Sequence, residues 1–436
     1  MLRRAQYDNW NMQLICDLEI HTKYARACSK DSDLPHHHLW ARKKGIDVVG
    51  TGDFTHPAWF RECGEQLEDA GEGLYKLKHA HHIPQHTAAS HDPLFMYTSE
   101  VACIFSRGGH VRRVHVLLFA PSREAAARLN ALLGKVGKLA SDGRPILGLD
   151  MIRLAEFARE ADPDFLVVPA HVWTPWFGMY GSKSGFDSFE EAWGEVAPWI
   201  PAVETGLSSD PPMNWRLGEL DHKTIISFSD AHSPPNLGRE ATVVEVAARS
   251  FRNITHALRS ETGKNRIRET YEFFPEEGMY HYDGHRACEV LWSPQETRKK
   301  KGICPKCGRP VTVGVLSRVE ELADRKEGYQ PRNRPEFRSL VPLQEIIGDG
   351  LERGKHSKGV TAIYETLVGA HASEFDILLR KPLDELKAFL DPIVVRGIER
   401  MRNGEVKKTP GYDGVYGSVE VFTERDRKRV QQESLF

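Results

Sequence analysis

Residues 13–25, QLICDLEIHTKYA, and residues 224–232, TIISFSDAH, decide the fold. Each is an apolar, strand-like run that finishes in acidic and imidazole side chains. Five further runs of this kind lie between them, and helix-like segments at 122–136, 149–160 and 251–260 alternate with the runs. Strands that alternate with helices predict a parallel α/β sheet or barrel. The five further runs cover residues 46–57, 96–105, 111–120, 165–173 and 202–206.

The polar residues at the ends of these runs predict a metal cluster. In α/β barrels the carboxyl ends of the strands carry the active site. Imidazole and carboxylate together suit Zn, Mn or Fe, whereas carboxylate and water alone suit Mg or Ca. Several metal ions held close together can activate water and neutralise a phosphate. The candidates are Asp17, Glu19, His21, Asp53, His56, Glu100, His115, His171, Glu204, Asp230 and His232.

The length, the net charge and the composition limit the classes of protein to which this chain can belong. The length of 436 residues is enough for about two to three domains. The net charge of -2 gives no overall signal for nucleic acid, so any such signal must be local. The start, MLRRAQYDNW, lacks the apolar stretch of a signal peptide, and no apolar run is long enough to span a membrane, so we expect a cytoplasmic protein. Seven cysteines, an odd number, favour metal binding in a reducing compartment over disulfides.

A second metal site is predicted around the CPKC motif. His285, Cys288, Cys304 and Cys307 have the spacing H-x2-C-x15-C-x2-C, which is typical of a structural zinc site. His281 competes with His285 for the fourth position. The run that includes Lys299 and Lys300 lies beside this motif and could contact a DNA backbone. A solvated basic loop is the alternative interpretation.

Changes in composition predict four parts along the chain. Residues 1–265 form the α/β barrel, which includes a His-rich and irregular excursion at 65–93. Residues 266–316 are turn-rich and hold the cysteine motif, so they form a small zinc-binding domain. Residues 317–422 carry apolar residues at spacings of three and four, which predicts a helical domain. Residues 423–436 form a flexible charged tail.

The order DLEIHT, GTGDFTHP, SEV, VHVLLF, PAH and SFSDAH resembles the polymerase-and-histidinol-phosphatase (PHP) domain over about the first 240 residues. The resemblance implies a distorted (β/α)7 barrel with a trinuclear metal site that hydrolyses phosphoester bonds. Glu19 departs from the family, which usually has the first His of a His-x-His pair at this position. Glu204 matches no family ligand, and we interpret it as a support for one. The implied ligands are Glu19, His21, Asp53, His56, Glu100, His115, His171, Asp230 and His232.

The last five residues, QESLF, resemble the pentapeptide that binds the bacterial β-type sliding clamp. The resemblance implies a polar anchor at Gln432 and an apolar pair, Leu435 and Phe436. The charged segment 424–431 would tether this peptide to the helical domain. A frayed helix end is the alternative interpretation.

Taken together, these parts resemble the endonuclease Q family over nearly the whole chain. The resemblance includes GTGDFTHP, the YHYDGHRAC…CPKCG block, VEELADR and PGYDGVYG. It implies a DNA repair endonuclease that cuts 5′ to uracil, hypoxanthine, xanthine or an abasic site by metal-activated water. Zn²⁺ is expected at the cysteine motif and in the barrel, with Mg²⁺ or Mn²⁺ for activity. A 3′-5′ exonuclease or a small-molecule phosphoesterase is the alternative. Arg107, Arg112 and Arg113 are candidate phosphate contacts, and surface arginines without a functional role are the alternative interpretation.

Overall fold

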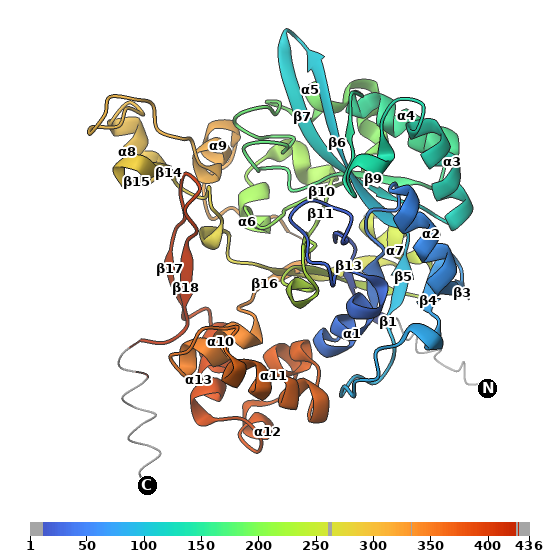
Figure 1. The fold of residues 1–436 in the computed structure, drawn as a ribbon. Helices are drawn as coiled ribbons and strands as arrows, with labels where there is room; N and C mark the ends of the chain where they lie inside the picture. The colour runs from blue at the N-terminus through green and yellow to red at the C-terminus, as the bar shows by residue number, and fades with distance from the viewer. Residues whose placement is uncertain (1–11, 260–263, 333, 424–425, 427–436) are drawn as a thin grey trace, which may run out of the picture.

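The computed structural model describes residues 12–259, 264–332, 334–423 and 426. Its centre is an eight-stranded sheet in the order β16-β13-β12-β1-β2-β5-β4-β3 and a four-stranded sheet in the order β8-β6-β7-β9 (Figure 1). β10 pairs in parallel with β11 beside them. The bounds of the strands that surround the site are β1 Met12–Asp17, β2 Val48–Gly50, β5 Leu94–Met96, β6 Thr98–Arg107, β7 His110–Phe119, β9 Leu166–Pro169, β10 Ala202–Glu204, β11 Thr224–Ile226 and β12 Ala241–Val246.

The ends of these strands lie next to one another. β1 pairs in parallel with β2, and β2 pairs in parallel with β5. Beyond β9 and β10, Val172 N donates to Glu204 O at 3.0 Å. Beyond β1 and β11, Ile20 and Ala231 form a parallel bridge. These links gather the carboxyl ends of β1, β2, β9, β10 and β11 on one side of the fold.

β7 runs against its neighbours, which corrects the expectation of an all-parallel arrangement. It pairs antiparallel with β6 over the register Thr98↔Phe119 to Arg107↔His110, and antiparallel with β9. Gly108 and Gly109, with φ of 60° and 77°, make the two-residue turn that the hairpin requires. His115 therefore lies within a strand that leads away from the turn. The β6–β7 hairpin projects from the body of the molecule (Figure 1).

Helices cover the strands where the sequence predicts them, and each begins at a capping side chain. The side chains of Ser122, Asp150 and Ser250 accept hydrogen bonds from backbone N–H groups in the first turns of α3, α4 and α7. α4 ends at Ala161, two residues before Pro163. The bounds of the barrel helices are α1 Leu34–Lys44, α2 Pro57–Gln66, α3 Arg123–Leu133, α4 Met151–Ala161 and α7 Phe251–Leu258.

The excursion at 65–93 is more regular than expected. It starts with the hairpin β3 (Leu67–Gly71) and β4 (Leu74–Leu77), which extends the large sheet at its edge. A short 3-10 turn at His79–His81 follows, and the chain then continues without regular structure until β5. The histidines of this stretch therefore lie in a connection that is anchored on both sides by the sheet.

The large sheet crosses the predicted domain boundaries. β13 (Arg266–Glu272) pairs with β12, although the sequence placed it in the zinc-binding segment. β16 (Glu336–Ser339) pairs with β13, although the sequence placed it among helices. Between them lie β14 (Asp283–His285) and β15 (Val290–Trp292), then α8 Pro294–Lys299 and α9 Val315–Leu322.

The C-terminal part is helical, as expected. Within it, a helix begins at Pro392 with Asp391 as its cap. A strand pair, β17 (Lys407–Thr409) and β18 (Ser418–Glu420), follows. The predicted clamp peptide at 432–436 lies outside the described residues. The helices are α10 Leu343–Gly350, α11 Lys358–Ala370, the π-helical turn Asp376–Arg380, α12 Leu383–Leu386 and α13 Pro392–Arg402.

Candidate metal centre

His21 lies at the centre of the strand-end cluster. Its Nδ1 is 2.9 Å from Asp53 Oδ1, and its Nε2 is 2.9 Å from Glu100 Oε2. The same Nε2 is 3.3 Å from Asp230 Oδ1, and the ring of His232 packs edge-on with centroids 4.7 Å apart. Side chains from the ends of β1 and β11 and from the start of β6 thus meet. Ligand atoms of His21, Asp230 and His232 lie within 4.8 Å of one another.

A second group forms around the other oxygen of Glu100. His115 Nδ1 and His171 Nε2 lie 2.6 Å and 3.0 Å from Glu100 Oε1, and the two ring nitrogens are 3.1 Å apart. All three residues are buried. The second ring nitrogen of His171 hydrogen-bonds with Thr174 Oγ1 at 2.9 Å, which fixes the ring as outer partners of metal-ligating histidines do. Glu100 joins the two groups, since each of its oxygens faces a different one.

Glu19 is a buried carboxylate whose two oxygens have no hydrogen-bond partner among the described residues. Burial raises the pKa of Glu19 well above its ordinary value, and the neighbouring carboxylate of Glu204 raises it further. Burial also raises the pKa of Glu204 to about 7. Glu19 forms a third acidic group with Glu100 and Asp230. A buried, unpaired carboxylate is costly, and a bound cation would offset that cost.

The backbone is strained at three residues of the cluster. Asp53, His171 and Asp230 have φ of 46°, 28° and 45°, in the left-handed region that non-glycine residues rarely adopt. Such strain costs about 1–3 kcal/mol per residue and persists where the surroundings enforce it. Asp17 and Glu204, which the sequence placed at these strand ends, hold the strained loops: Asp17 accepts from Ser229 N and Gly238 N, and Glu204 Oε2 accepts from His171 N.

Asp53 and His56 make contacts that differ from those of the other predicted ligands. Asp53 Oδ1 faces His21 Nδ1, and Asp53 Oδ2 accepts from the backbone and hydroxyl of Thr22 at 2.7 Å and 2.6 Å. His56 caps α2 by accepting from Trp59 N, and its ring stacks on Tyr24 with centroids 4.3 Å apart. These contacts orient neighbours, and the structure does not bring His56 into the three groups of converging ligand atoms.

Burial and neighbouring charges shift the pKa of His21, His115 and Glu100. Burial opposes charge on His21, but Asp53, Asp230 and Glu100 outweigh it and hold the pKa of His21 well above its ordinary value. Burial lowers the pKa of His115 to about 4, so this ring is a neutral imidazole near pH 7. The pKa of Glu100 lies well below its ordinary value, because Arg144 and His115 outweigh burial. The centre thus combines the ionised carboxylate of Glu100 with the neutral imidazole of His115.

Arg144 is a residue that the sequence did not single out. Its Nη1 is 2.9 Å from Glu100 Oε2, and it borders a hollow that His115 and Phe177 also line. The loop that carries Arg144 approaches closely because Gly143 has no side chain: a Cβ there would lie 2.4 Å from Asp53 Oδ2. The only feature of the sequence at this position is the loop tripeptide Gly-Arg-Pro, and a loop has no strand or helix periodicity from which Arg144 could be predicted.

The arginines predicted to contact phosphate are partly engaged within the fold. Arg107 Nε donates to Asp150 Oδ2 at 3.0 Å, and its Nη1 donates to the backbone carbonyls of residues 191 and 192. Arg112 donates to Gly185 O and to Glu191, and stacks over the ring of Phe186. These contacts tie the β6–β7 hairpin to Asp150, which caps α4, and to the segment 185–192. DNA contact by Arg107, Arg112 and Arg113 stays a prediction.

The predicted zinc-binding motif forms a compact group. Ligand atoms of His285, Cys288, Cys304 and Cys307 lie within 4.8 Å of one another. His285 Nδ1 is 3.4 Å from Cys307 Sγ, at the end of the β14–β15 hairpin. The competing His281 is buried outside this group, stacked on Tyr282. The four residues match the mixed imidazole and thiolate set of a tetrahedral zinc site.

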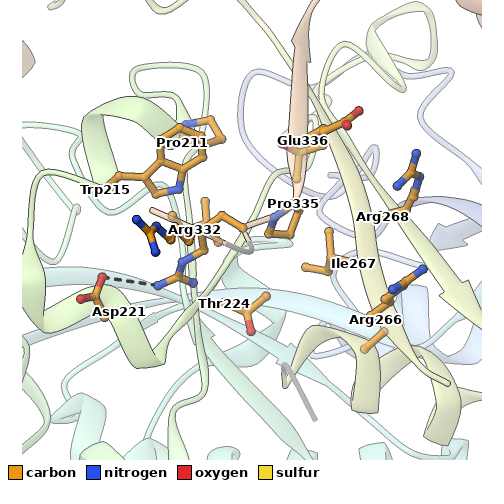
Figure 2. A pocket seen from close by; sticks show the side chains of 14 residues that line it. Pro211, Trp215, Asp221, Thr224, Arg266, Ile267, Arg268, Arg332, Pro335 and Glu336 are labelled. Carbon is orange, nitrogen blue, oxygen red and sulfur yellow. Dashed lines mark ion pairs between the residues drawn. The ribbon is translucent and has the colours of Figure 1, made fainter. Parts of the chain in front are cut away.

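A larger hollow lies elsewhere, and none of the predicted site residues lines it. It is bordered by the starts of β11, β13 and β16 (Figure 2). Arg334, one of its arginines, donates to the backbone carbonyls of Lys223 and Leu220. Arg268 and Arg332 also border the hollow.

Within the described part of the chain, no helix is long and apolar enough to cross a membrane.

A family model, the MJ0043 C-terminal domain, matches residues 342–405, the helical part. The chain is 33% identical over 270 residues to the uncharacterized protein MJ0043 of Methanocaldococcus jannaschii, and the match covers 60% of this chain and 33% of that protein. The chain thus spans about a third of that relative. It is 28% identical over 311 residues to the uncharacterized protein YqxK of Bacillus subtilis, covering 70% of this chain and 73% of that protein.

Two solved structures share the mixed α/β fold over nearly the full length. The lesion-specific endonuclease PfuEndoQ from Pyrococcus furiosus superposes with a TM-score of 0.82 at 30% identity, covering 96% of this chain and 97% of that chain. A complex of endonuclease Q with a 27-mer duplex substrate that has an abasic lesion at the active site gives a TM-score of 0.82 at 30% identity, covering 96% and 98%. This chain therefore belongs to the endonuclease Q family.

Proposed function

We propose that this protein is a DNA repair endonuclease that hydrolyses the phosphodiester bond 5′ to a damaged nucleotide. The damage would be a deaminated base, namely uracil, hypoxanthine or xanthine, or an abasic site. One observation carries the proposal: in a chain of the endonuclease Q family, three acid and imidazole groups converge at the strand ends. The relative solved with DNA holds an abasic lesion at its active site, which supports the lesion-directed part.

The cluster fits divalent metal ions. Four buried carboxylate oxygens, on Glu19, Glu204 and Asp230, lack hydrogen-bond partners among the described residues, and imidazole rings lie in the same groups of ligand atoms. Such ions supply, when bound, an activated water near neutral pH and positive charge beside a phosphate. The mixed donors suit Zn²⁺ or Mn²⁺, with added Mg²⁺ or Mn²⁺ supporting activity. We propose Glu19, His21, Glu100, His115, His171, Asp230 and His232 as ligands.

The remaining residues of the centre would position these ligands. Asp53 would hold His21 through Nδ1, in the carboxylate–histidine arrangement that raises the basicity of a ligand. Glu204 and Asp17 would keep the strained loops after β9 and β11 in place. His56 would fix the start of α2 beside Asp53. The sequence-based ligand set also includes Asp53 and His56, and metal content of the variants Asp53→Asn and His56→Gln would separate the two roles.

Arg144 would bind the scissile phosphate. Its guanidinium is oriented by Glu100 and borders the hollow beside the cluster. A guanidinium binds two phosphate oxygens at once and stays charged at any working pH. Recognition of the damaged nucleotide would require it to leave the helical stack, which costs least where pairing is already weak. Arg107, Arg112, Arg113, Lys299 and Lys300 would contact the DNA backbone outside the centre.

We also propose the organisation that the sequence predicted. The catalytic part, about 1–265, would be a distorted (β/α)7 barrel of the PHP type, followed by a zinc-binding unit at 266–316 and a helical domain at 317–422. β13 and β16 would connect these parts through the shared sheet. His285, Cys288, Cys304 and Cys307 would hold a structural Zn²⁺. The tail would bind a sliding clamp through Gln432, Leu435 and Phe436.

A nicking assay tests the proposed function. Purified protein with Mg²⁺ or Mn²⁺ is given closed circular and linear duplexes that carry one uracil, hypoxanthine, xanthine or abasic site, with undamaged duplexes as controls. We expect one cut 5′ to the lesion in both forms, which a chelator abolishes. Shortening of linear DNA alone would indicate a 3′-5′ exonuclease. Release of phosphate from small esters without any nicking would indicate a small-molecule phosphoesterase.

A further inference from the structure

A third cluster of metal-ligating side chains lies in the His-rich connection, apart from both sites described above. His38 is on α1, whereas His82 and Asp92 are in the segment between β4 and β5. One ligand atom from each residue lies within 4.8 Å of the other two. His38 Nε2 is 3.5 Å from Asp92 Oδ1, and the His38 and His82 rings are 4.3 Å apart between centroids. None of the three takes part in the centre at the strand ends.

The separation of His38 and Asp92 is that of two ligands around one ion. In a tetrahedral zinc site with bonds of about 2.0–2.1 Å, neighbouring ligand atoms lie about 3.4 Å apart. The measured 3.5 Å between His38 and Asp92 agrees with that edge. Imidazole with one carboxylate is a donor set for Zn²⁺ and related first-row ions.

His38 has a nitrogen that the fold leaves without a partner. Its side chain is 3% exposed, and Nε2 has no hydrogen bond from any described residue although it points toward Asp92. Leaving a buried polar atom unpaired costs about 1–3 kcal/mol. A bound cation would use this lone pair, whereas apolar packing alone would leave it unsatisfied.

The second histidine is oriented as a ligand would be. His82 Nε2 is 3.1 Å from the carbonyl oxygen of Leu77. A carbonyl only accepts, so Nε2 carries the proton and Nδ1 keeps its lone pair. Ligating histidines typically donate the other ring N–H to a backbone carbonyl in this way.

Arg42 is the competing cation. Its Nε is 3.3 Å from the same Asp92 oxygen that faces His38. This ion pair accounts for the position of Asp92 but leaves His38 Nε2 unsatisfied. Asp92 is half-exposed, with 52% of its side chain open to solvent, so its second oxygen can accept Arg42 when the first binds an ion.

We propose that His38, His82 and Asp92 bind one divalent ion of the zinc class, with solvent completing the coordination. The ion would join α1 to the segment 78–93, and both contact the C-terminal helices. Lys44 on α1 pairs with Glu374 at 2.8 Å, and in the segment His86 hydrogen-bonds with Gly369 O at 2.7 Å. The ion would therefore stabilise the segment 78–93, which contacts the C-terminal helices.

Metal stoichiometry of the full chain tests this site. Protein stripped by a chelator is reloaded with Zn²⁺, desalted, and its zinc is measured per chain by mass spectrometry. His82→Gln and Asp92→Asn are compared with His81→Gln, a neighbouring histidine outside the cluster, and folding of each is checked by circular dichroism. We expect His82→Gln and Asp92→Asn each to bind about one ion fewer than the unmodified chain, with His81→Gln unchanged.

Two outcomes would overturn the proposal. One is unchanged stoichiometry in folded His82→Gln and Asp92→Asn. The other is an equal loss in His81→Gln. Amide exchange of residues 79–93 gives a second readout: Zn²⁺ should slow it in the unmodified chain and have less effect in His82→Gln, and an equal effect in both would also contradict the site. Neither measurement depends on nicking, so failure here is distinct from failure of the proposed endonuclease.

Discussion

Glu19 and Glu204 are two buried carboxylates at the ends of β1 and β10, and the charge of Glu204 adds to the effect of burial in raising the pKa of Glu19. Glu204 has one oxygen engaged by His171 N, while both oxygens of Glu19 lack partners among the described residues. We therefore expect different roles for the two residues, although both are buried acids. Glu19 is free to hold a cation, and Glu204 positions the strand end that carries His171.

Glu19→Gln should lower the nicking rate by about 100-fold or more, because it removes a charged ligand but keeps the size of the side chain. Glu204→Gln should cost about 10-fold, as changes outside the ligands do. Glu19→His, which restores the usual PHP pattern, should retain more activity than Glu19→Gln. Single-turnover nicking with metal content per chain checks this. Equal losses in Glu19→Gln and Glu204→Gln would contradict the division of roles.

Arg144→Ala should lower the single-turnover nicking rate by about 10²–10³-fold, because the guanidinium is held where phosphate charge develops. Arg26 borders the same hollow but is exposed, so Arg26→Ala is the matched control and should change the rate little. The barrel metal content of Arg144→Ala should equal that of the unmodified chain. Loss of metal in this variant would show that Arg144 acts on the ligands and not on the phosphate.

Apolar runs in the sequence predicted the strands and their polar ends, because burial of each strand requires a continuous apolar stretch. They did not predict the direction of β7, since the apolar pattern of a strand does not distinguish parallel from antiparallel pairing with its neighbours. The Gly108-Gly109 turn was the local signal for the hairpin. The sequence also could not reveal the pairing of β16 with β13, which joins segments more than sixty residues apart.

The sequence likewise predicted some residues of the candidate site and not others. Residues that follow an apolar run, such as His171 and Asp230, could be predicted from their place after that run, whereas Glu100 lies near the start of β6. Arg144, in a loop, could not, because its role depends on how Gly143 allows the loop to approach Asp53. The contacts that separate Asp53 from the other acids are likewise tertiary, since Thr22 and His21 use both of its oxygens.

His285→Gln should reduce zinc per chain by about one ion, because a Cys₃His site loses a ligand. His281→Gln is the control, since His281 lies outside the group of four. The measurement is zinc released by a thiol-reactive reagent, which reports the cysteine site and not the barrel. If zinc release is lost in His281→Gln and kept in His285→Gln, then His281 and not His285 is the fourth ligand.

Removal of residues 432–436 should abolish binding to a bacterial β-type clamp and leave nicking of a short lesion-bearing duplex unchanged. The Leu435 and Phe436 pair supplies the apolar anchor of such a peptide, and short anchors bind through a few buried side chains. Surface plasmon resonance on immobilised clamp checks the first part. Replacement of the preceding residues 427–431 by a sequence of the same charge is the control and should keep binding.

The buried carboxyl of Glu272 should make the free energy of unfolding depend on pH, and Glu272→Gln should remove that dependence. Its carboxyl is fully buried and accepts from Ser227 Oγ at 2.7 Å, and burial raises its pKa to about 8 from 4.5. The unfolded chain releases this proton near pH 4.5, whereas the folded chain keeps it until about pH 8. The stability from Glu272 is therefore complete below about pH 4.5 and is lost as the pH rises through 8, with a slope of at most about 1.4 kcal/mol per pH unit.

Gln has no proton to lose, so the slope that Glu272 contributes is absent in Glu272→Gln. Urea unfolding at several values from pH 5 to pH 8 should show the unmodified chain losing stability relative to the variant as the pH rises. Glu336→Gln, on the exposed side of β16, is the control and should follow the unmodified chain throughout. A constant difference between the unmodified chain and Glu272→Gln over this range would mean that the buried carboxyl is ionised in the folded protein, because only a group that keeps its proton on folding couples stability to pH in this direction.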